Sequence, residues 1–227
     1  KFAADNDDLI TRRLAGMGVW KAPVETHDFV LEGGGIEVDG EGTLLTTERC
    51  LLAPTRNPTF TQSGIENYLA PLLGTRRVLW LKHGDLLGDD TDGHIDTLAR
   101  FCSPGLIAYQ GCDDPSDPHF EELSFMEAEL EAFRRANGEP YELVPLPLPD
   151  PIFDDDGERL PAGYANFLIV NGGVLVPVYG VSQDLEALRR LRPCFPNRRV
   201  VPVDCRWLIR QYGSLHCVTM QIPAAPG

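Results

Sequence analysis

The sequence predicts an α/β fold built from repeated units, each made of a β-hairpin, a helix and one further strand. The first observation is an apolar strand that follows a turn glycine three times, after Gly42, Gly105 and Gly173, at intervals of 63 and 68 residues. The second is that an amphipathic stretch and then another apolar strand follow each of these hairpins. Repeats of this kind stack side by side and share a hydrophobic core.

The first repeat follows an N-terminal helix. Segment 5–18 has Asp and Asn residues that can cap a helix, apolar residues at helical spacing and two glycines that end it. Residues 26–47 form extended segments divided by three consecutive glycines and by a glycine-rich turn, a pattern typical of a hairpin. A helix at 63–74 and a strand at 76–81 complete the unit.

The remaining residues hold two more complete units and the start of a fourth. These units comprise hairpins at 94–109 and 164–180, helices at 120–138 and 182–195, and strands at 142–148 and 198–205. An apolar, strand-like run at 213–223 begins the fourth unit. Because a repeat cut off after one strand needs its completion elsewhere, we expect strands that precede Lys1 in a longer protein to supply it.

Composition and charge exclude several classes of protein. With 43% hydrophobic and 24% charged residues, the chain is typical of a soluble globular protein. The formal net charge of −14 argues against a nucleic-acid or anionic-membrane partner, because both need basic patches. No apolar run reaches the roughly 20 residues that span a bilayer, and no signal-peptide core is present at the N-terminus. The 6 cysteines lack a CxxC pair and therefore predict reduced thiols and a cytoplasmic location.

Segment 91–101, TDGHIDTLARF, carries a His and an Asp two residues apart. In a strand, His94 and Asp96 share one face, while Ile95 and Thr97 point the other way. Two such side chains that project together after a glycine turn indicate a candidate site. A buried histidine that is satisfied by its own aspartate is the alternative.

Glu32 ends an apolar run and precedes three glycines. Because backbone without Cβ atoms lets a ligand approach closely, Glu32 is a candidate ligand carboxylate. A solvated turn residue is the alternative at this position.

The run 213–223 holds an adjacent His and Cys. Cys217 could be core filling, half of a disulfide, a metal ligand or a nucleophile. In a strand, His216 and Cys217 point to opposite faces, so a base for the thiol would come from another unit, where His94 has a comparable position. The histidines and cysteines lack the paired spacing of zinc sites, and the chain has no P-loop, GxSxG or dinucleotide motif. We therefore expect no metal and no cofactor.

Four motifs resemble one known family when they are taken together. VLEGGGIEVDGEGTLLTTERCLL with the RNP that follows at 56–58, TDGHIDTLARF, LPLPDP with the later ANFLIVNGGVLVPVYG, and GSLHCVTMQIP are similar, in this order, to the agmatine deiminases. This family includes the Porphyromonas-type peptidylarginine deiminases and belongs to the guanidine-modifying pentein superfamily. The resemblance implies a pentein-type α/β propeller with five-fold pseudo-symmetry and a central active site. Residues 1–227 would form a single catalytic domain, the C-terminal two thirds of that propeller.

The resemblance also implies roles for four residues. Cys217 matches the nucleophile, His94 the general acid/base, and Asp96 and Glu32 two carboxylates that bind the guanidinium group. It implies no cofactor, and it makes a homodimer the expected assembly. Many members have Gly-Gly-Gly-Asn where this chain has Tyr212-Gly213-Ser214 before Leu215, so the resemblance leaves the substrate less certain than the chemistry.

The implied reaction is hydrolysis of a C–N bond in a linear amidine. The substrate would be agmatine, a small cationic guanidinium compound, and the products N-carbamoylputrescine and ammonia, a step of putrescine biosynthesis in polyamine metabolism. Alternatives are a peptidyl-arginine or free-arginine deiminase, an amidinotransferase, and a non-catalytic guanidine- or polyamine-binding protein. An inactive piece of an active enzyme is a further alternative, because an open ring cannot close its channel.

Overall fold

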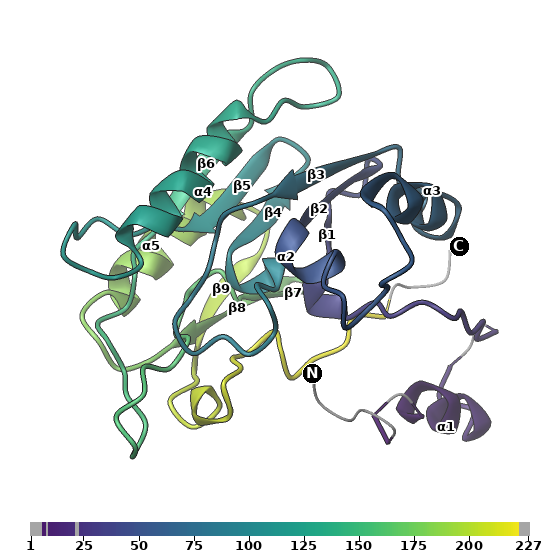
Figure 1. Ribbon diagram of the computed structural model, residues 1–227. Helices are drawn as coiled ribbons and strands as arrows, with labels where there is room; N and C mark the ends of the chain where they lie inside the picture. Colours follow the sequence, from purple (N-terminus) through teal and green to yellow (C-terminus); the bar gives the residue numbers. More distant parts are fainter. Residues whose placement is uncertain (1–5, 8, 21–22, 223–227) are drawn as a thin grey trace.

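Three small sheets of identical topology form the body of the computed structural model, which describes residues 6–7, 9–20 and 23–222 (Figure 1). In each sheet, two antiparallel strands form a hairpin, and a third strand pairs in parallel with the second after a helical crossover. The predicted order of hairpin, helix and strand is confirmed in all three units.

The first unit contains β1 (Glu37–Val38), β2 (Thr43–Thr47), α2 (Glu48–Leu51), α3 (Gln62–Leu73) and β3 (Arg77–Leu81). Thr61 caps α3 by accepting a hydrogen bond from Gly64 N, and Gly74 ends it in the left-handed conformation at φ 67°. The short helix α2 was not predicted. It packs Cys50 and Leu51 into the core beneath the sheet.

The second unit contains β4 (Ala99–Ser103), β5 (Leu106–Gln110), α4 (Phe120–Ala132) and β6 (Glu142–Leu146), and the third contains β7 (Leu168–Val170), β8 (Gly173–Val178), α5 (Asp184–Cys194) and β9 (Arg199–Asp204). Helix α4 ends earlier than predicted because the chain turns back through an antiparallel bridge between Arg134 and Pro140. The N-terminal helix α1 (Ile10–Gly16) buries no residue and stands away from the sheets in Figure 1.

Neighbouring units share their cores, as the repeat predicts. Leu45 and Leu81 of the first sheet pack in one cluster with residues of the second unit. Ala108 and Leu146 of the second sheet pack in another cluster with residues of the third. Because α4 contacts β3, and α5 contacts both β6 and β9, these helices join adjacent sheets. No helix in the described ranges has the length and apolar character to cross a bilayer.

The hairpin predicted at 94–109 is present, but its first strand begins later than predicted. Residues 95–97 form the 3-10 helix η2 (Ile95–Thr97), and β4 begins only at Ala99. Asp92 and Gly93 precede this turn with positive φ angles of 64° and 78°, and Thr97 Oγ1 closes it by donating to His94 O. Such a turn breaks the alternation of faces that the strand prediction assumed.

The run 213–222 is also not a strand. After the 3-10 helix η3 (Ile209–Gln211), Tyr212 is left-handed at φ 64°, and the chain continues as turns. None of the described strands pairs with this run in a ladder, although the Gln221 side chain donates to Ile169 O in β7, and side chains satisfy some of its backbone groups. Asn166 accepts from His216 N at 2.7 Å, while Thr219 Oγ1 donates to His216 O at 2.8 Å. Pro223 lies outside the described residues.

Candidate active site

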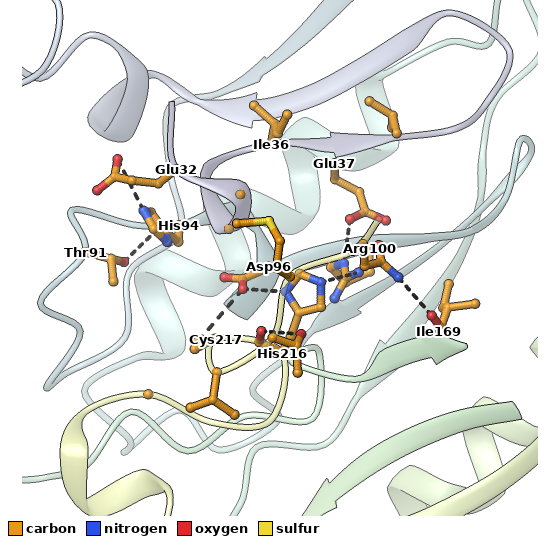
Figure 2. A pocket seen from close by; sticks show the side chains of 18 of the residues that line it. Glu32, Ile36, Glu37, Thr91, His94, Asp96, Arg100, Ile169, His216 and Cys217 are labelled. Carbon is orange, nitrogen blue, oxygen red and sulfur yellow. Dashed lines mark hydrogen bonds and ion pairs between the residues drawn. The ribbon is translucent and has the colours of Figure 1, made fainter. Parts of the chain in front are cut away.

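A cavity of about 1000 Å³ opens between the units. Loops of the first and second units and the C-terminal turns line it together, and Figure 2 shows the side chains that meet there. All four predicted site residues (Glu32, His94, Asp96 and Cys217) line this one cavity. Segments far apart in the sequence therefore bring the four predicted residues together at one cavity.

Asp96 lies at the centre of the constellation with no solvent exposure. Its Oδ2 accepts a hydrogen bond from His216 Nδ1 at 2.7 Å. Its Oδ1 is buried and has no hydrogen-bond partner among the described residues. A buried carboxylate oxygen without a hydrogen-bond donor costs free energy unless a ligand supplies the donor. Asp96 Oδ1 is therefore free to accept a hydrogen bond from a bound cation.

A buried chain of polar groups behind Asp96 fixes the protonation of His216. Arg100, 2% exposed, donates from Nε to Glu37 at 2.6 Å, from Nη1 to Phe167 O at 2.8 Å and from Nη2 to His216 Nε2 at 3.3 Å. Because a guanidinium can only donate, His216 Nε2 must accept and its proton must sit on Nδ1. The neutral imidazole donates that proton to Asp96, which thus keeps its negative charge.

Cys217 is exposed at the cavity surface, beside Asp96 and Asn166. Its Sγ lies 3.9 Å from Asp96 Oδ2, and Asn166 Nδ2 donates to it at 3.3 Å. Burial of the thiol and the negative charge of Asp96 raise the pKa of Cys217 to about 11. Without a ligand the group is therefore a neutral thiol at pH 7. Both nitrogens of the adjacent His216 are engaged, so His216 is no base for Cys217.

Glu32 and His94 form the other side of the site, held by Arg56. Arg56 donates to both carboxylate oxygens of Glu32, at 3.0 Å for the Nη2–Oε1 bond, and His94 Nε2 lies 3.6 Å from Glu32 Oε2. Although burial opposes the shift, the contacts with His94 and Arg56 lower the pKa of Glu32 to about 2. Burial likewise opposes the shift at His94, but contacts with Cys50 and Glu32 raise its pKa to about 10. His94 is therefore an imidazolium at pH 7.

The glycine triplet after Glu32 lets the backbone approach the site. A Cβ at Gly34 would lie 2.6 Å from His94 Nδ1 and 2.9 Å from Asp96 Oδ2, distances that side chains do not tolerate. A Cβ at Gly33 would meet nothing within 4 Å. Gly34 therefore leaves room for the His94 and Asp96 side chains, while the predicted close approach of a ligand stays a prediction.

We expect Gly34→Ala to lower turnover by about 100-fold, because the added methyl displaces both His94 and Asp96 and misplacement by ~1 Å can cost that much. Gly33→Ala is the matched control in the same turn and should lose far less. Steady-state rates and thermal unfolding of both variants check this. Equal rates for the two variants would contradict the proposed contact.

The sequence pattern missed Asn166, His216, Arg100 and Arg56 as parts of the site. Asn166 is 1% exposed, which is unusual for an Asn, and a polar residue directly before the apolar FLIV strand was the available signal. The two arginines lie within stretches that carry the resemblance, but nothing in their local sequence shows that they are buried. The structure records no hydrogen bond between His94 and Cys217; Asp96 lies between them in Figure 2.

Comparison with known proteins identifies the family of the chain. The model of the Porphyromonas-type peptidyl-arginine deiminases matches residues 1–223. The agmatine deiminase of Medicago truncatula is 38% identical, over 96% of this chain and 63% of the relative. Curated relatives are longer, and the chain spans 64%, 63% and 63% of three of them.

Two solved structures are similar throughout. A Porphyromonas gingivalis protein, provisionally assigned as an arginine deiminase, is 54% identical with a TM-score of 0.94, over 98% of this chain and 66% of its own. The agmatine deiminase of C. jejuni, solved as a Cys-to-Ser variant with substrate bound, is 38% identical with a TM-score of 0.89, over 96% of this chain and 63% of its own. The chain belongs to the Porphyromonas-type peptidyl-arginine deiminase family.

Proposed function

We propose that this chain carries the catalytic residues of an agmatine deiminase, a hydrolase that converts the guanidinium group of agmatine to a ureido group and releases ammonia. The observation that supports this most is that two buried atoms, Asp96 Oδ1 and His94 Nε2, have no hydrogen-bond partner among the described residues, although His94 Nε2 lies 3.6 Å from Glu32 Oε2. Both residues line the same cavity as Cys217. A guanidinium, planar and rich in N–H donors, provides donors for such carboxylate oxygens.

Binding would place the guanidinium between the two acidic side chains. Asp96 receives N–H donors on its free Oδ1, and Glu32 receives them on the opposite side. Asp96 Oδ2 already accepts from His216 Nδ1, which leaves Oδ1 for the substrate, and the pKa of Glu32 is lowered to about 2, so Glu32 is ionised at pH 7. The central carbon then faces the Cys217 sulfur.

The substrate itself would activate the nucleophile. A cation bound beside Cys217 offsets the charge of Asp96 and lowers the thiol pKa, so the proton leaves to solvent and the thiolate attacks the guanidinium carbon. His94 donates a proton to one amino group, the C–N bond breaks, and ammonia leaves. The remaining intermediate is a cationic amidino-thioether on Cys217.

Hydrolysis of the intermediate completes the cycle. His94, now neutral, accepts a proton from water, and the hydroxide adds to the same carbon. The C–S bond then breaks, the sulfur leaves as the thiolate, and the ureido product departs. The proton released by the product and the one held by His94 restore the starting imidazolium and thiol.

The charges lining the cavity favour agmatine over free arginine. The α-carboxylate of arginine needs a cationic partner, and Arg100 is the sole Lys or Arg among the described lining residues. Arg100 is 2% exposed, and its donors already reach Glu37, Phe167 and His216. Agmatine has no carboxylate. Relatives named agmatine deiminase, such as those of Medicago truncatula and Pseudomonas aeruginosa, support the same choice.

The wider architecture follows from the same proposal. Three units with one topology, in a chain that spans under two thirds of its relatives, fit a five-unit propeller closed by further units of a longer protein. Residues 1–227 are then the larger part of one catalytic domain. The 6 free cysteines fit a reducing, cytoplasmic setting. A homodimer stays a prediction.

Ammonia release from agmatine, free arginine and an arginyl peptide, measured separately with the full-length protein, tests the function. We expect turnover of agmatine and its loss in Cys217→Ala, because Cys217 is the one cysteine among the described residues that line the cavity. Turnover of the peptide alone or of arginine alone would show that agmatine is not the substrate, while the proposed deimination reaction would stand. Binding of agmatine without ammonia release in the wild-type protein would identify a non-catalytic binder.

A further inference from the structure

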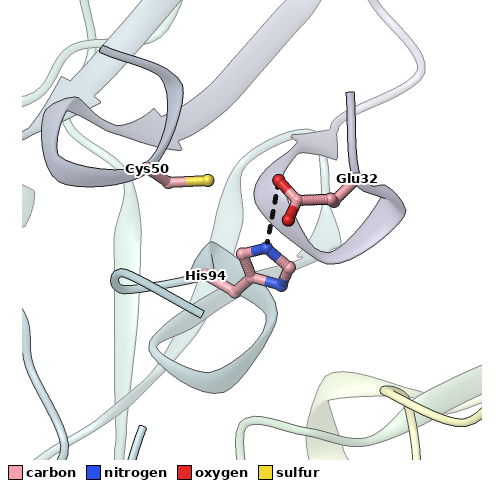
Figure 3. Close-up of side chains that lie close together, drawn as sticks. All are labelled: Glu32, Cys50 and His94. Atoms are coloured by element: carbon pink, nitrogen blue, oxygen red, sulfur yellow. Dashed lines mark ion pairs between the residues drawn. The ribbon is translucent and has the colours of Figure 1, made fainter. Parts of the chain in front are cut away.

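We propose that Glu32, Cys50 and His94 form a binding site for a thiophilic divalent cation such as Zn²⁺, and that the bound ion competes with the guanidinium substrate. Figure 3 shows the three side chains converging from separate segments of the chain. One ligand atom from each, Sγ, a ring nitrogen and a carboxylate oxygen, lies within 4.8 Å of the others.

Cys50 has no role in the deimination chemistry, yet its thiol is held next to the histidine. It lies on α2, fully buried, with its N–H donating to Thr47 Oγ1 at 3.1 Å. Its Sγ would lie 3.0 Å from a Cβ at Gly35, so the glycine triplet leaves room for the sulfur as well as for substrate. Because α2 is anchored at its first turn, the thiol is fixed in position.

The geometry is close to that of a zinc site. Tetrahedral zinc, with bonds of about 2.0 Å to nitrogen or oxygen and 2.3 Å to sulfur, separates its ligand atoms by ~3.3–3.8 Å. His94 Nε2 lies 3.6 Å from Glu32 Oε2, within that range. The same Nε2 is buried and lacks a hydrogen-bond partner among the described residues. Movement of the ligand atoms by about 1 Å would complete three bonds, and water would fill the fourth position.

The donor set selects the type of ion. One thiolate, one imidazole and one carboxylate suit Zn²⁺ or Co²⁺, whereas Mg²⁺ and Ca²⁺ prefer oxygen ligands. Binding replaces the thiol proton of Cys50 and the imidazolium proton of His94, so two protons leave and no oxidation occurs. Affinity therefore rises with pH.

Arg56 sets a limit on that affinity. Its guanidinium is paired with Glu32 and, at 2.9 Å, with Asp92, so a positive charge already lies beside the ligands. A divalent ion must share Glu32 with Arg56, which disfavours permanent occupancy. These features fit a reversible inhibitory site better than a structural one.

Competition with substrate follows from shared residues. The metal occupies Glu32 and neutral His94, the groups that the proposed function assigns to guanidinium binding and proton donation. Substrate and metal therefore exclude each other. This inhibitory consequence rests on the proposed function; the binding of metal by the three ligands does not.

Cobalt absorption tests the binding directly. We expect Co²⁺ added to the full-length protein to produce a thiolate-to-cobalt charge-transfer band in the wild type and in Cys217→Ser, and no band in Cys50→Ser or in Cys50→Ala. Two substitutions of Cys50 are used in case one of them prevents folding. Thermal unfolding of each variant shows whether it is folded. A band that persists without Cys50 and disappears without Cys217 would overturn the assignment, as would the absence of any band.

Inhibition provides the second measurement. Zn²⁺ should inhibit ammonia release competitively with agmatine and reversibly with a chelator. Each rate is taken relative to the same variant without metal, and Cys50→Ser should raise the half-inhibitory Zn²⁺ concentration at least ~10-fold, since a thiolate ligand is lost. Unchanged sensitivity in Cys50→Ser would overturn the role of Cys50. If the wild type releases no ammonia, the proposed function fails while the cobalt result still decides the site.

Discussion

Asp96→Asn should lower kcat/KM for agmatine by about 100- to 1000-fold, as expected for loss of one member of a buried, hydrogen-bonded charge pair. Asn keeps the shape and can still accept from His216 Nδ1 through its oxygen. Its amide then presents N–H donors where the substrate also presents donors. The loss should appear in both KM and kcat, because the same carboxylate binds the cation and orients it toward Cys217. Steady-state ammonia release checks this.

The same substitution should change the thiol in the opposite direction. The pKa of Cys217 is raised to about 11 by burial and then by the charge of Asp96. A neutral Asn removes the second cause, so the thiol pKa falls and more thiolate is present at pH 8. Alkylation of Cys217 by iodoacetamide should therefore be faster in Asp96→Asn than in the wild type, although turnover is slower.

These opposite changes distinguish the proposed role from damage to the fold. A misfolded cavity would lose turnover, and its cysteines would all react at similar rates. In the free wild-type protein, alkylation should rise by about tenfold per pH unit up to pH 11, as the fraction of thiolate does. Alkylation of Asp96→Asn that is no faster at pH 8 would contradict the electrostatic coupling.

The repeat could be predicted from the sequence because each unit carries its own signals. Turn glycines such as Gly173, alternating apolar strands and amphipathic helices act within about 15 residues, which is the range over which a pattern can be read without a fold. The strand predicted at 213–222 is wrong because the same local pattern says nothing about neighbouring strands. These residues are as apolar as a strand, but a strand needs a neighbour, and here the neighbour is the Asn166 side chain.

The site could be predicted only in part, for a related reason. His94 and Asp96 were found through their spacing and the resemblance, although the turn at η2, and not a strand, presents them. His216 and Asp96 are 120 residues apart, and Arg100 and His216 are 116 apart. Contacts over such separations depend on how the units pack, which no local pattern encodes. Cys50 was not predicted as part of the proposed metal site for the same reason, because three separate segments each supply one ligand of that site.

The second large effect is expected on stability, from Arg100→Met. Its guanidinium lies at 2.6 Å from Glu37, and the two side chains are 2% and 10% exposed. Removing the guanidinium leaves the buried Glu37 carboxylate without its cation. Phe167 O and His216 Nε2 also lose their hydrogen-bond donor. Breaking a buried pair in this way costs about 3–5 kcal/mol of the free energy of unfolding. Urea denaturation should show a lower midpoint with an unchanged slope.

A comparison with an exposed ion pair tests whether burial, and not the ion pair itself, causes the loss of unfolding free energy in Arg100→Met. Arg206 and Asp204 are also 2.6 Å apart, but their side chains are 61% and 52% exposed. Water solvates Asp204 when its partner is lost, so Arg206→Met should leave the denaturation midpoint unchanged. The double variant Arg100→Met/Glu37→Gln should recover part of the loss, since the uncompensated charge is gone. Equal effects of the two arginine substitutions, or no recovery in the double variant, would show that Arg100 acts through packing alone.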